Sequence, residues 1–120
     1  MEKAVKVMVV DDDREVLSVM AYGLESYGYQ VRTCENATEA LLLALTDPCE
    51  FVITDHDMPG MDGVELTRRL RGLLPAAVII GMSGRDHGMV FLRAGANDFV
   101  QKPFVPYDLV MMIDGRDLSS

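Results

Sequence analysis

The sequence predicts an α/β fold in which a doubly wound, five-stranded parallel sheet is flanked by five helices. Short apolar runs rich in Val and Ile alternate with stretches whose apolar residues recur at helical spacing, and this alternation occurs five times. The apolar runs have the continuous hydrophobic pattern of strands that are buried on both faces. Because connections between parallel strands are right-handed, the helices are expected on both faces of the sheet. The length of 120 residues fits one domain, residues 1–120.

The first strand and the first helix are predicted near the N-terminus. Val5–Val10 is a short apolar run that stops at Asp11, as expected for a buried strand. Asp13 is expected to cap the helix that follows, and Gly28 stands where a helix C-terminus is expected. The apolar residues at helical spacing between these two positions are Val16, Met20, Leu24 and Tyr27.

A second strand, a second helix and a third strand come next. Tyr29–Cys34 predicts the second strand, and Phe51–Thr54 predicts the third. Either Asn36 or Thr38 is expected to cap the helix between them, which stops before Pro48. The apolar residues that this helix is expected to carry are Ala40, Leu41, Ala44 and Leu45.

The rest of the chain predicts three helices and two strands. Asp62 is expected to cap a helix that ends at Pro75. The apolar residues of that helix are Leu66, Leu70 and Leu73. The remaining elements are predicted as a strand over Ala77–Met82, a short helix over His87–Ala94 ended by Gly95, a brief strand over Phe99–Gln101 and a helix over Tyr107–Ile113.

Composition excludes several classes of function. The chain has 19 acidic residues against 11 Lys and Arg, and its net charge of −8 repels phosphate backbones, so we expect no direct nucleic-acid binding. The apolar run at the N-terminus is too short for a signal peptide or a membrane span, so we expect a cytoplasmic protein with no membrane contact. Cys34 and Cys49 form no CxxC pair and are expected to be reduced, buried thiols.

Polar side chains follow four of the predicted strands. Asp11 and Asp12 follow the first strand, Asp55 the third, Ser83 the fourth and Lys102 the fifth. In sheets of this kind ligands bind beyond the carboxyl ends of the strands, so these groups are expected to meet at one edge. Crowded carboxylates need a positive charge among them, and Mg²⁺ prefers oxygen ligands together with a phosphate. The residue types therefore predict magnesium and phosphoryl chemistry, with an Asp carboxylate as nucleophile.

Four stretches of the chain resemble the receiver domain of two-component response regulators, including the chemotaxis regulators. They are VMVVDDD at Val7–Asp13, FVITDHDMPGMDG at Phe51–Gly63, IIGMSG at Ile79–Gly84 and AGANDFVQKPF at Ala94–Phe104. The resemblance implies a flavodoxin-like sheet with strand order 2-1-3-4-5. It also implies a signalling domain that takes a phosphoryl group from a histidine kinase or phosphotransfer protein and changes a surface for an output partner. Because no output segment follows Ser120, either a stand-alone receiver or a receiver cut from a longer protein is expected.

The resemblance implies roles for the acidic residues. Asp55 corresponds to the phosphoacceptor, while Asp11 and Asp12 correspond to the acidic pair that binds Mg²⁺, with Asp12 preferred as the direct ligand. Asp55 itself belongs to the implied magnesium site. Asp57 matches the position whose backbone carbonyl binds the metal. On this basis we expect no turnover of a separate substrate, only self-catalysed phosphoryl acceptance and slow hydrolysis.

The resemblance also implies a switch. Ser83 is similar to the hydroxyl residue that turns toward the phosphoryl group, Phe99 to the switch aromatic, and Lys102 to the lysine that precedes a cis-proline, here Pro103. The span from Ser83 to Lys102 is shorter than is usual in the family. It also contains glycine at positions 84 and 88, which weakens a helix, so the fourth helix is expected to be short or irregular.

Plainer interpretations of single residues stay open. Phe99 also fits a core aromatic, and Ser83 also fits a strand-end cap. His56 and His87 are expected to be exposed loop residues. Gly81 either admits a bulky neighbour close to the strand or is neutral.

Two other functions are open as well. One is a phosphorylation-independent docking module of the same fold, although the chain keeps the full set Asp11, Asp12, Asp55, Ser83 and Lys102. The other is a metal-dependent phosphatase of the haloacid dehalogenase type, because Asp55-His56-Asp57 has the acid-x-acid form. That family carries its nucleophile after the first strand, whereas the acid pair here follows the third.

Overall fold

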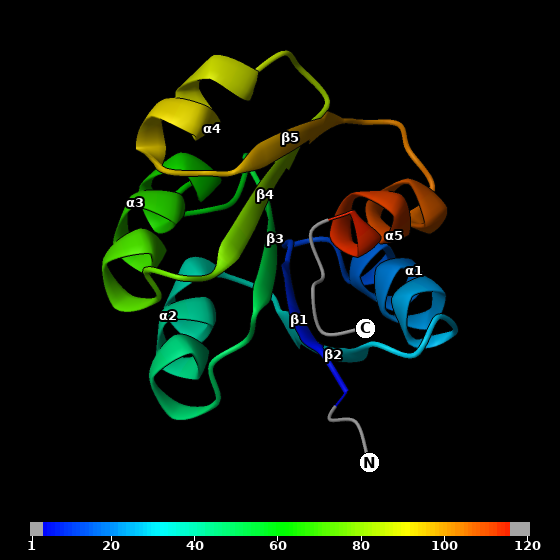
Figure 1. The fold of residues 1–120 in the computed structure, drawn as a ribbon. Coiled ribbons are helices and arrows are strands. Elements are labelled where there is room, and N and C mark those ends of the chain that lie inside the picture. The colour runs from blue at the N-terminus through cyan, green and yellow to red at the C-terminus, as the bar shows by residue number, and fades with distance from the viewer. Residues whose placement is uncertain (1–3, 116–120) are drawn as a thin grey trace.

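Strands and helices alternate along residues 4–115, which are the residues that the computed structural model describes (Figure 1). The strands are β1 (Lys6–Val10), β2 (Gln30–Cys34), β3 (Phe51–Asp55), β4 (Val78–Ser83) and β5 (Asp98–Gln101). The helices are α1 (Arg14–Glu25), α2 (Ala37–Thr46), α3 (Gly63–Leu73), α4 (Gly88–Ala94) and α5 (Pro106–Asp114). The predicted α/β class with five helices is therefore confirmed.

The five strands form one parallel sheet with the order β2-β1-β3-β4-β5, as predicted. Helices α2, α3 and α4 cover one face of the sheet, and α1 and α5 cover the other (Figure 1). The strand order reverses between β1 and β3, which is where ligands bind in doubly wound sheets. Within residues 4–115, every helix is too short or too polar to cross a membrane.

Alternate residues of the central strands supply two hydrophobic cores, one on each face of the sheet. Met8 and Val52 contribute to the core under α2, α3 and α4, whereas Val9 and Ile53 contribute to the core under α1 and α5. All four are fully buried. Burial of such a side chain stabilises the fold by about 1.5–3 kcal/mol, which explains why these strands are apolar on both faces.

The first helix is shorter than its apolar pattern predicted. It ends at Glu25, because the next backbone bonds, from Tyr27 to Leu24 and from Gly28 to Glu25, span three residues instead of four. Tyr27 lies beyond the helix, and its ring centroid is 5.9 Å from that of Tyr107. The buried residues of α1 are Leu17, Met20 and Leu24, and Val16 is partly buried against the same core. Of the predicted helical positions, only Tyr27 was wrong, because it lies beyond the helix and is 54% exposed.

Three predicted N-terminal caps are confirmed. The side chain of Asp13 accepts hydrogen bonds from the first turn of α1, and Asp62 accepts one from Glu65 in α3. Asn36, not Thr38, caps α2. Leu45 of α2 is 67% exposed, so its predicted place among the core-facing residues was wrong. The other strands and helices begin and end within a few residues of their predicted bounds.

The two cysteines behave as predicted. Cys34 and Cys49 are buried and, in the part of the chain that is described, unpaired in any disulfide. Burial raises the pKa of Cys34 to about 12 and that of Cys49 to about 11, so both remain protonated thiols at neutral pH.

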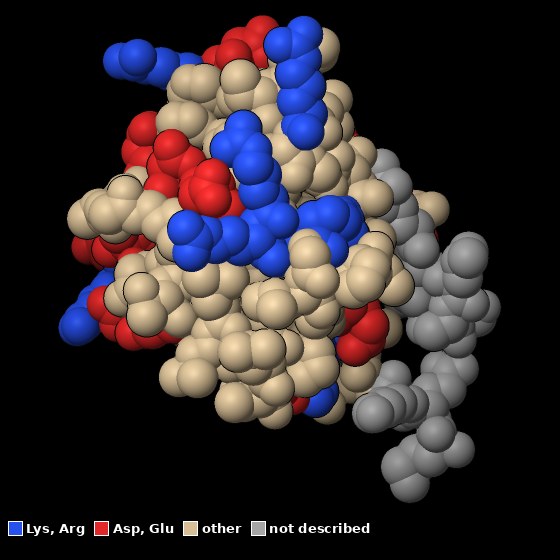
Figure 2. All heavy atoms as spheres, turned by 90° about the vertical axis from the view of Figure 1, so that its left-hand side faces the viewer, with Lys and Arg blue, Asp and Glu red and all other residues tan. Residues whose placement is uncertain are grey.

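Helix α4 has seven residues, which confirms the prediction of a short fourth helix. Its C-terminal end is tied to α3 by Arg71, whose guanidinium donates to the carbonyl oxygen of Gly95 at 2.7 and 3.0 Å and to Oδ1 of Asn97 at 2.7 Å. Arg71 also donates to the carbonyl oxygen of Ala77 at 2.6 Å. Figure 2 shows Lys and Arg gathered in a band across the side of the molecule where α3 and α4 lie.

Gly81 in β4 provides the space for the largest fully buried side chain. A Cβ atom at this position would lie 2.4 Å from the ring of Phe91. The ring therefore rests directly on the strand, and α4 approaches the sheet closely. Of the two interpretations of Gly81, the structure supports the close approach of a bulky neighbour.

We expect Gly81→Ala to lower the free energy of unfolding by about 1–3 kcal/mol, because the added methyl group overfills a packed core. Urea unfolding followed by circular dichroism measures this. Gly72→Ala in α3 is the matched control, since a Cβ there meets no atom of the described chain within 4 Å. That variant is expected to be up to about 1 kcal/mol more stable. Equal stability of Gly81→Ala and the wild type would contradict the packing described above.

Candidate functional site

The register of the sheet brings the predicted site residues to one edge. Val10 of β1 lies opposite Thr54 of β3, so the residues that follow them, Asp11 and Asp55, emerge side by side. On the other side of β3, Ser83 of β4 lies opposite the last residue of β5. The backbone N–H of Lys102 donates to the carbonyl oxygen of Ser83 at 2.7 Å. Backbone pairing alone therefore gathers these four residues.

Three carboxylates form a cluster at this edge. Oxygen atoms of Asp11, Asp12 and Asp55 all lie within 4.8 Å of one another. Asp11 and Asp55 are buried, with 1% and 6% of their surface exposed, whereas Asp12 is exposed. Asp55 is the last residue of β3, and one of the Asp11 oxygens accepts the backbone N–H of Asp13 at 2.9 Å. The cluster thus combines two fixed, buried carboxylates with one that faces water.

Lys102 reaches the two buried carboxylates from the opposite side. Its Nζ lies 3.1 Å from Oδ1 of Asp55 and 3.3 Å from Oδ2 of Asp11. The peptide bond between Lys102 and Pro103 is cis, as the sequence resemblance implied. One ammonium group therefore bridges the ends of β1 and β3.

The pKa values of these groups show the balance of charge at the site. Burial raises the pKa of Asp11 above its usual value, and it does the same to Asp55, where the neighbouring Asp11 charge adds to the effect. Lys102 lowers both values but does not cancel the effect of burial. For Lys102 itself, burial lowers the pKa, yet its hydrogen bond to Asp55 and the nearby carboxylates leave that pKa above its usual value. The ion pairs of Lys102 with Asp11 and Asp55 are favourable, but one ammonium group does not fully offset the charge of the two carboxylates.

This donor set fits a magnesium ion. Three carboxylates against one ammonium group leave two uncompensated negative charges when all three acids are ionised. A divalent cation balances that charge, and Mg²⁺ is usually held by one or two carboxylates while it keeps several waters. Because Asp12 is exposed, water has access to the cluster.

The loop after β3 is held close to the site by a glycine. The N–H of Gly63 donates to the carbonyl oxygen of His56 at 2.9 Å, and a Cβ atom on Gly63 would lie 1.9 Å from the carbonyl oxygen of Asp55. The side chain of Asp57 is 77% exposed, and its Oδ1 lies 2.8 Å from Nδ1 of His56. This hydrogen bond keeps the pKa of Asp57 below its usual value. The Asp57 carboxylate is thus occupied by His56.

The two predicted switch residues lie on neighbouring strands, Ser83 at the end of β4 and Phe99 in β5. Ser83 is 1% exposed, and its Oγ accepts the N–H of Arg85 at 3.1 Å, as a strand-end cap would. Phe99 is partly buried and packs against the core, with its ring centroid 5.8 Å from that of Phe91. In this structure Ser83 therefore has the contacts of a strand-end cap, and Phe99 has those of a core aromatic.

Two histidines belong to the site region, although the sequence was interpreted otherwise. His56 and His87 both lie in loops, but neither is exposed, and their rings stack with centroids 3.8 Å apart and an interplanar angle of 9°. Nδ1 of His87 lies 2.8 Å from Oγ of Ser83. The expectation of exposed histidines was wrong because the short loop before α4 folds back over the loop after β3. Their positions, directly after Asp55 and four residues after Ser83, were the signal that could have found them.

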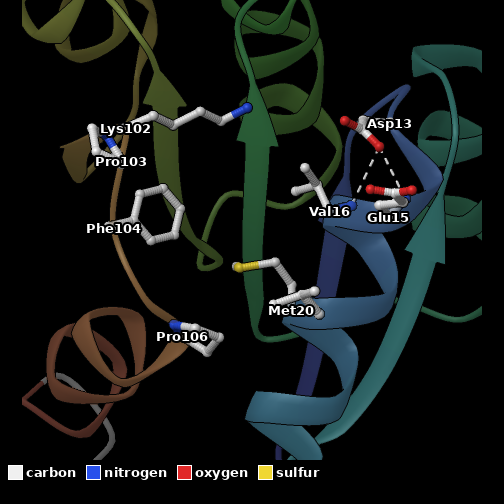
Figure 3. A pocket seen from close by; sticks show the side chains of 9 residues that line it. Asp13, Glu15, Val16, Met20, Lys102, Pro103, Phe104 and Pro106 are labelled. Carbon is white, nitrogen blue, oxygen red and sulfur yellow. Dashed lines mark hydrogen bonds between the residues drawn. The ribbon is translucent and has the colours of Figure 1, made fainter.

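An apolar groove of about 370 Å³ adjoins the site between α1 and the connection from β5 to α5. Figure 3 shows Val16 and Met20 on one wall and Phe104 and Pro106 on the other. The side chain of Lys102 extends above the groove toward the end of β3. The groove therefore opens directly beside the ammonium group that contacts Asp55.

Comparisons with known proteins agree with this arrangement. The family model described as response regulator receiver domain matches residues 7–114. The transcriptional regulatory protein PrrA of Mycobacterium tuberculosis is 36% identical over 111 residues, which are 90% of this chain and 48% of PrrA. The C4-dicarboxylate transport transcriptional regulatory protein DctD of Rhizobium meliloti is 37% identical over 113 residues, 92% of this chain and 25% of DctD. The chain spans about half the length of PrrA and a quarter of DctD.

Solved structures show the same fold. A CheY-like receiver domain from Methanospirillum hungatei superimposes with a TM-score of 0.90 and 28% identity, covering 95% of this chain and 94% of that one. The chemotaxis response regulator CheY4 of Vibrio cholerae gives a TM-score of 0.88 and 25% identity, with 94% and 98% covered. Together with the family match over nearly the whole chain, these likenesses show that the chain belongs to the response regulator receiver domains of two-component signal transduction.

Proposed function

We propose that the chain accepts a phosphoryl group on Asp55 from a histidine kinase or phosphotransfer protein, with Mg²⁺ bound at the same edge of the sheet. The observation that carries this proposal is the position of Lys102, whose Nζ lies 3.1 Å from Asp55 inside a cluster of three carboxylates. A buried carboxylate with both a lysine and a cation site beside it is suited to form an acyl phosphate. The membership of a signalling family supports the same conclusion.

Phosphoryl transfer would use a carboxylate oxygen of Asp55 as the nucleophile. That oxygen attacks the phosphorus of a phosphohistidine, the new P–O bond forms as the P–N bond breaks, and the imidazole leaves with the electron pair. Lys102 is close enough to bind an oxygen of the transferred group. Asp11, Asp12, Asp55 and the backbone carbonyl of Asp57 would hold Mg²⁺, which when bound supplies positive charge to the transferred group.

The phosphodonor protein would approach beside Lys102. The groove between α1 and the β5–α5 connection offers an apolar surface at that place, lined by Val16, Val19 and Phe104 among others. An acidic chain with net charge −8 suits a partner with a basic surface. Because histidine kinases transfer phosphate inside the cell, the proposal includes a cytoplasmic location.

Phosphorylation would then change the surface formed by α4, β5 and α5. It adds about −1.5 to −2 charges together with new acceptor oxygens. The hydroxyl of Ser83 and the ammonium group of Lys102 can pair with those oxygens. Movement of Ser83 opens space near Phe99, and the difference in contacts between the two states shifts the population toward the one that an output partner binds.

Incubation with acetyl phosphate and Mg²⁺ is expected to add the mass of one phosphoryl group to the chain. Asp55→Asn is expected to abolish this gain, because the amide nitrogen and oxygen are poor nucleophiles. Intact-mass spectrometry measures both. The matched control is Asp86→Asn, an exposed acid in the loop before α4, which should gain mass as the wild type does.

A gain that persists in Asp55→Asn, or no gain in the wild type, would contradict the proposal and favour a docking module that acts without phosphorylation. Turnover of a phosphomonoester by the wild type would instead favour a phosphatase, since a receiver should show none.

The contribution of Asp11 and Asp55 to the stability of the metal-free chain is expected to fall as pH rises. Asp11 and Asp55 have raised pKa values, so the native state binds protons more tightly than the unfolded state from the usual aspartate pKa of about 3.9 up to the raised values. Stability is therefore lost on ionisation as pH rises through this window. Lys102 has a raised pKa as well, so its contribution is complete at neutral pH and is lost only at alkaline pH.

Asp55→Asn is therefore expected to melt at a higher temperature than the wild type at neutral pH in EDTA. The difference in melting temperature should shrink as pH falls below about 3.9, because the aspartate of the wild type is then uncharged, as the asparagine of the variant is at every pH. Mg²⁺ should raise the melting temperature of the wild type more than that of the variant. Asp86→Asn controls for the general loss of one negative charge. A wild type that melts at or above Asp55→Asn in EDTA would contradict the charge crowding.

A further inference from the structure

The hydroxyl group of Ser83 is engaged before any phosphorylation takes place. Its Oγ accepts the N–H of Arg85 at 3.1 Å and lies 2.8 Å from Nδ1 of His87. A serine hydroxyl has one proton to donate. Among the described hydrogen bonds of this buried group, Nδ1 of His87 can accept that proton when the imidazole carries its own proton on Nε2.

The ring of His87 is held in this position by a second contact. It stacks on the ring of His56 with centroids 3.8 Å apart. His56 is fixed in turn by its hydrogen bond to Asp57 at 2.8 Å and by the edge-on contact with the buried ring of Phe91, with centroids 5.9 Å apart. The imidazole that lies 2.8 Å from the Ser83 hydroxyl is therefore part of a packed arrangement.

His87 is also the residue from which α4 starts. It occupies the N-cap position, and its carbonyl oxygen accepts the N–H of Phe91 at 3.1 Å. In the described structure its side chain makes no capping bond to the helix, so the contacts of that side chain lie with Ser83 and His56 instead. The start of α4 is thus attached through one side chain to the strand that ends at Ser83.

We propose that His87 is a positioning residue for the phosphoryl-transfer site: by accepting a hydrogen bond from the Ser83 hydroxyl it keeps that hydroxyl from donating to a phosphoryl group on Asp55, and release of this hydrogen bond frees the start of α4. The inference rests on the proposed function. The two hydrogen bonds compete, because a hydroxyl with one proton donates either to Nδ1 of His87 or to an oxygen of the phosphoryl group. When Ser83 donates to His87, the start of α4 is held to β4, and when Ser83 donates to the phosphoryl group, the start of α4 is released.

Two substitutions separate the hydrogen bond from the stack. His87→Phe keeps an aromatic ring against His56 and removes the acceptor, whereas His87→Asn keeps an acceptor near Nδ1 and removes the ring. The rate of phosphorylation by acetyl phosphate with Mg²⁺, followed by intact mass, is the readout. His87→Phe is expected to be phosphorylated about two- to tenfold faster than the wild type, the range that corresponds to one neutral hydrogen bond. His87→Asn should restore a rate close to that of the wild type.

The same substitution in a Ser83→Ala background tests the competition directly. Without the hydroxyl there is no proton to release, so His87→Phe should have no effect on the rate in that background. Met89→Ala, on the exposed face of α4 with 61% of Met89 accessible, controls for general perturbation of the helix. An equal acceleration by His87→Phe with and without the Ser83 hydroxyl, or no acceleration in either, would overturn the inference.

A measurement on the unaltered protein does not depend on the variants folding. Nitrogen NMR of the His87 imidazole is expected to show the neutral tautomer with the proton on Nε2, and the Nδ1 signal should shift on phosphorylation. A proton on Nδ1 before phosphorylation would overturn the inference even if Asp55 is phosphorylated normally. If the wild type gains no phosphoryl group on Asp55, the proposed function fails first, and the inference about His87 fails with it.

Discussion

The contact on which the rest of the site depends is the bridge that Lys102 makes between the buried carboxylates of Asp11 and Asp55. Two acids at the ends of neighbouring strands would repel each other without it, and the fold would lose stability there. The bridge does not neutralise the site, because burial still raises the pKa of both acids. A divalent cation would offset this residual charge, which is the physical reason why the proposed phosphoryl transfer and the proposed metal binding would share one place.

The sheet positions the site residues, and two glycines allow helices α3 and α4 to pack closely beside them. Gly63 lets the start of α3 lie against the backbone of Asp55, and Gly81 lets the ring of Phe91 lie against β4. A side chain at either position would push a helix away from the strand that it covers. The loops that carry His56 and His87 start from these anchored elements, so the two loops meet above the site. The arrangement of the histidines is thus a consequence of how closely α3 and α4 pack.

The gathering of the acidic residues could be predicted from local patterns and from the rules of parallel sheets. The strand order was implied by the family resemblance, and the short α4 by that resemblance together with the glycines at positions 84 and 88. Prediction from the sequence failed where the result depends on how distant loops pack. The apolar stripe of α1 was extended to Tyr27, although the turn to β2 ends the helix at Glu25. The expectation of exposed histidines was wrong because the stack between His56 and His87 depends on how two distant loops pack, and their nearness to Asp55 and Ser83 was the one signal for it in the sequence. The reason for a glycine at position 81 also depends on the packing of a distant residue, because the ring of Phe91 occupies the space of a Cβ atom there.

Helix α4 is attached by different means at its two ends. At its C-terminal end, Arg71 of α3 binds the carbonyl oxygen of Gly95 with two nitrogen atoms and also holds Asn97 at the start of the next strand. At its N-terminal end, the contacts of the His87 side chain lead to Ser83 and His56. The first attachment consists of several bonds from Arg71 in the last turn of α3, whereas the second depends on the hydroxyl of Ser83, the last residue of β4. On the proposed function, a change in charge at the acidic cluster would act on one end of a seven-residue helix while Arg71 holds the other, so the helix would rotate about its C-terminal end instead of moving as a whole.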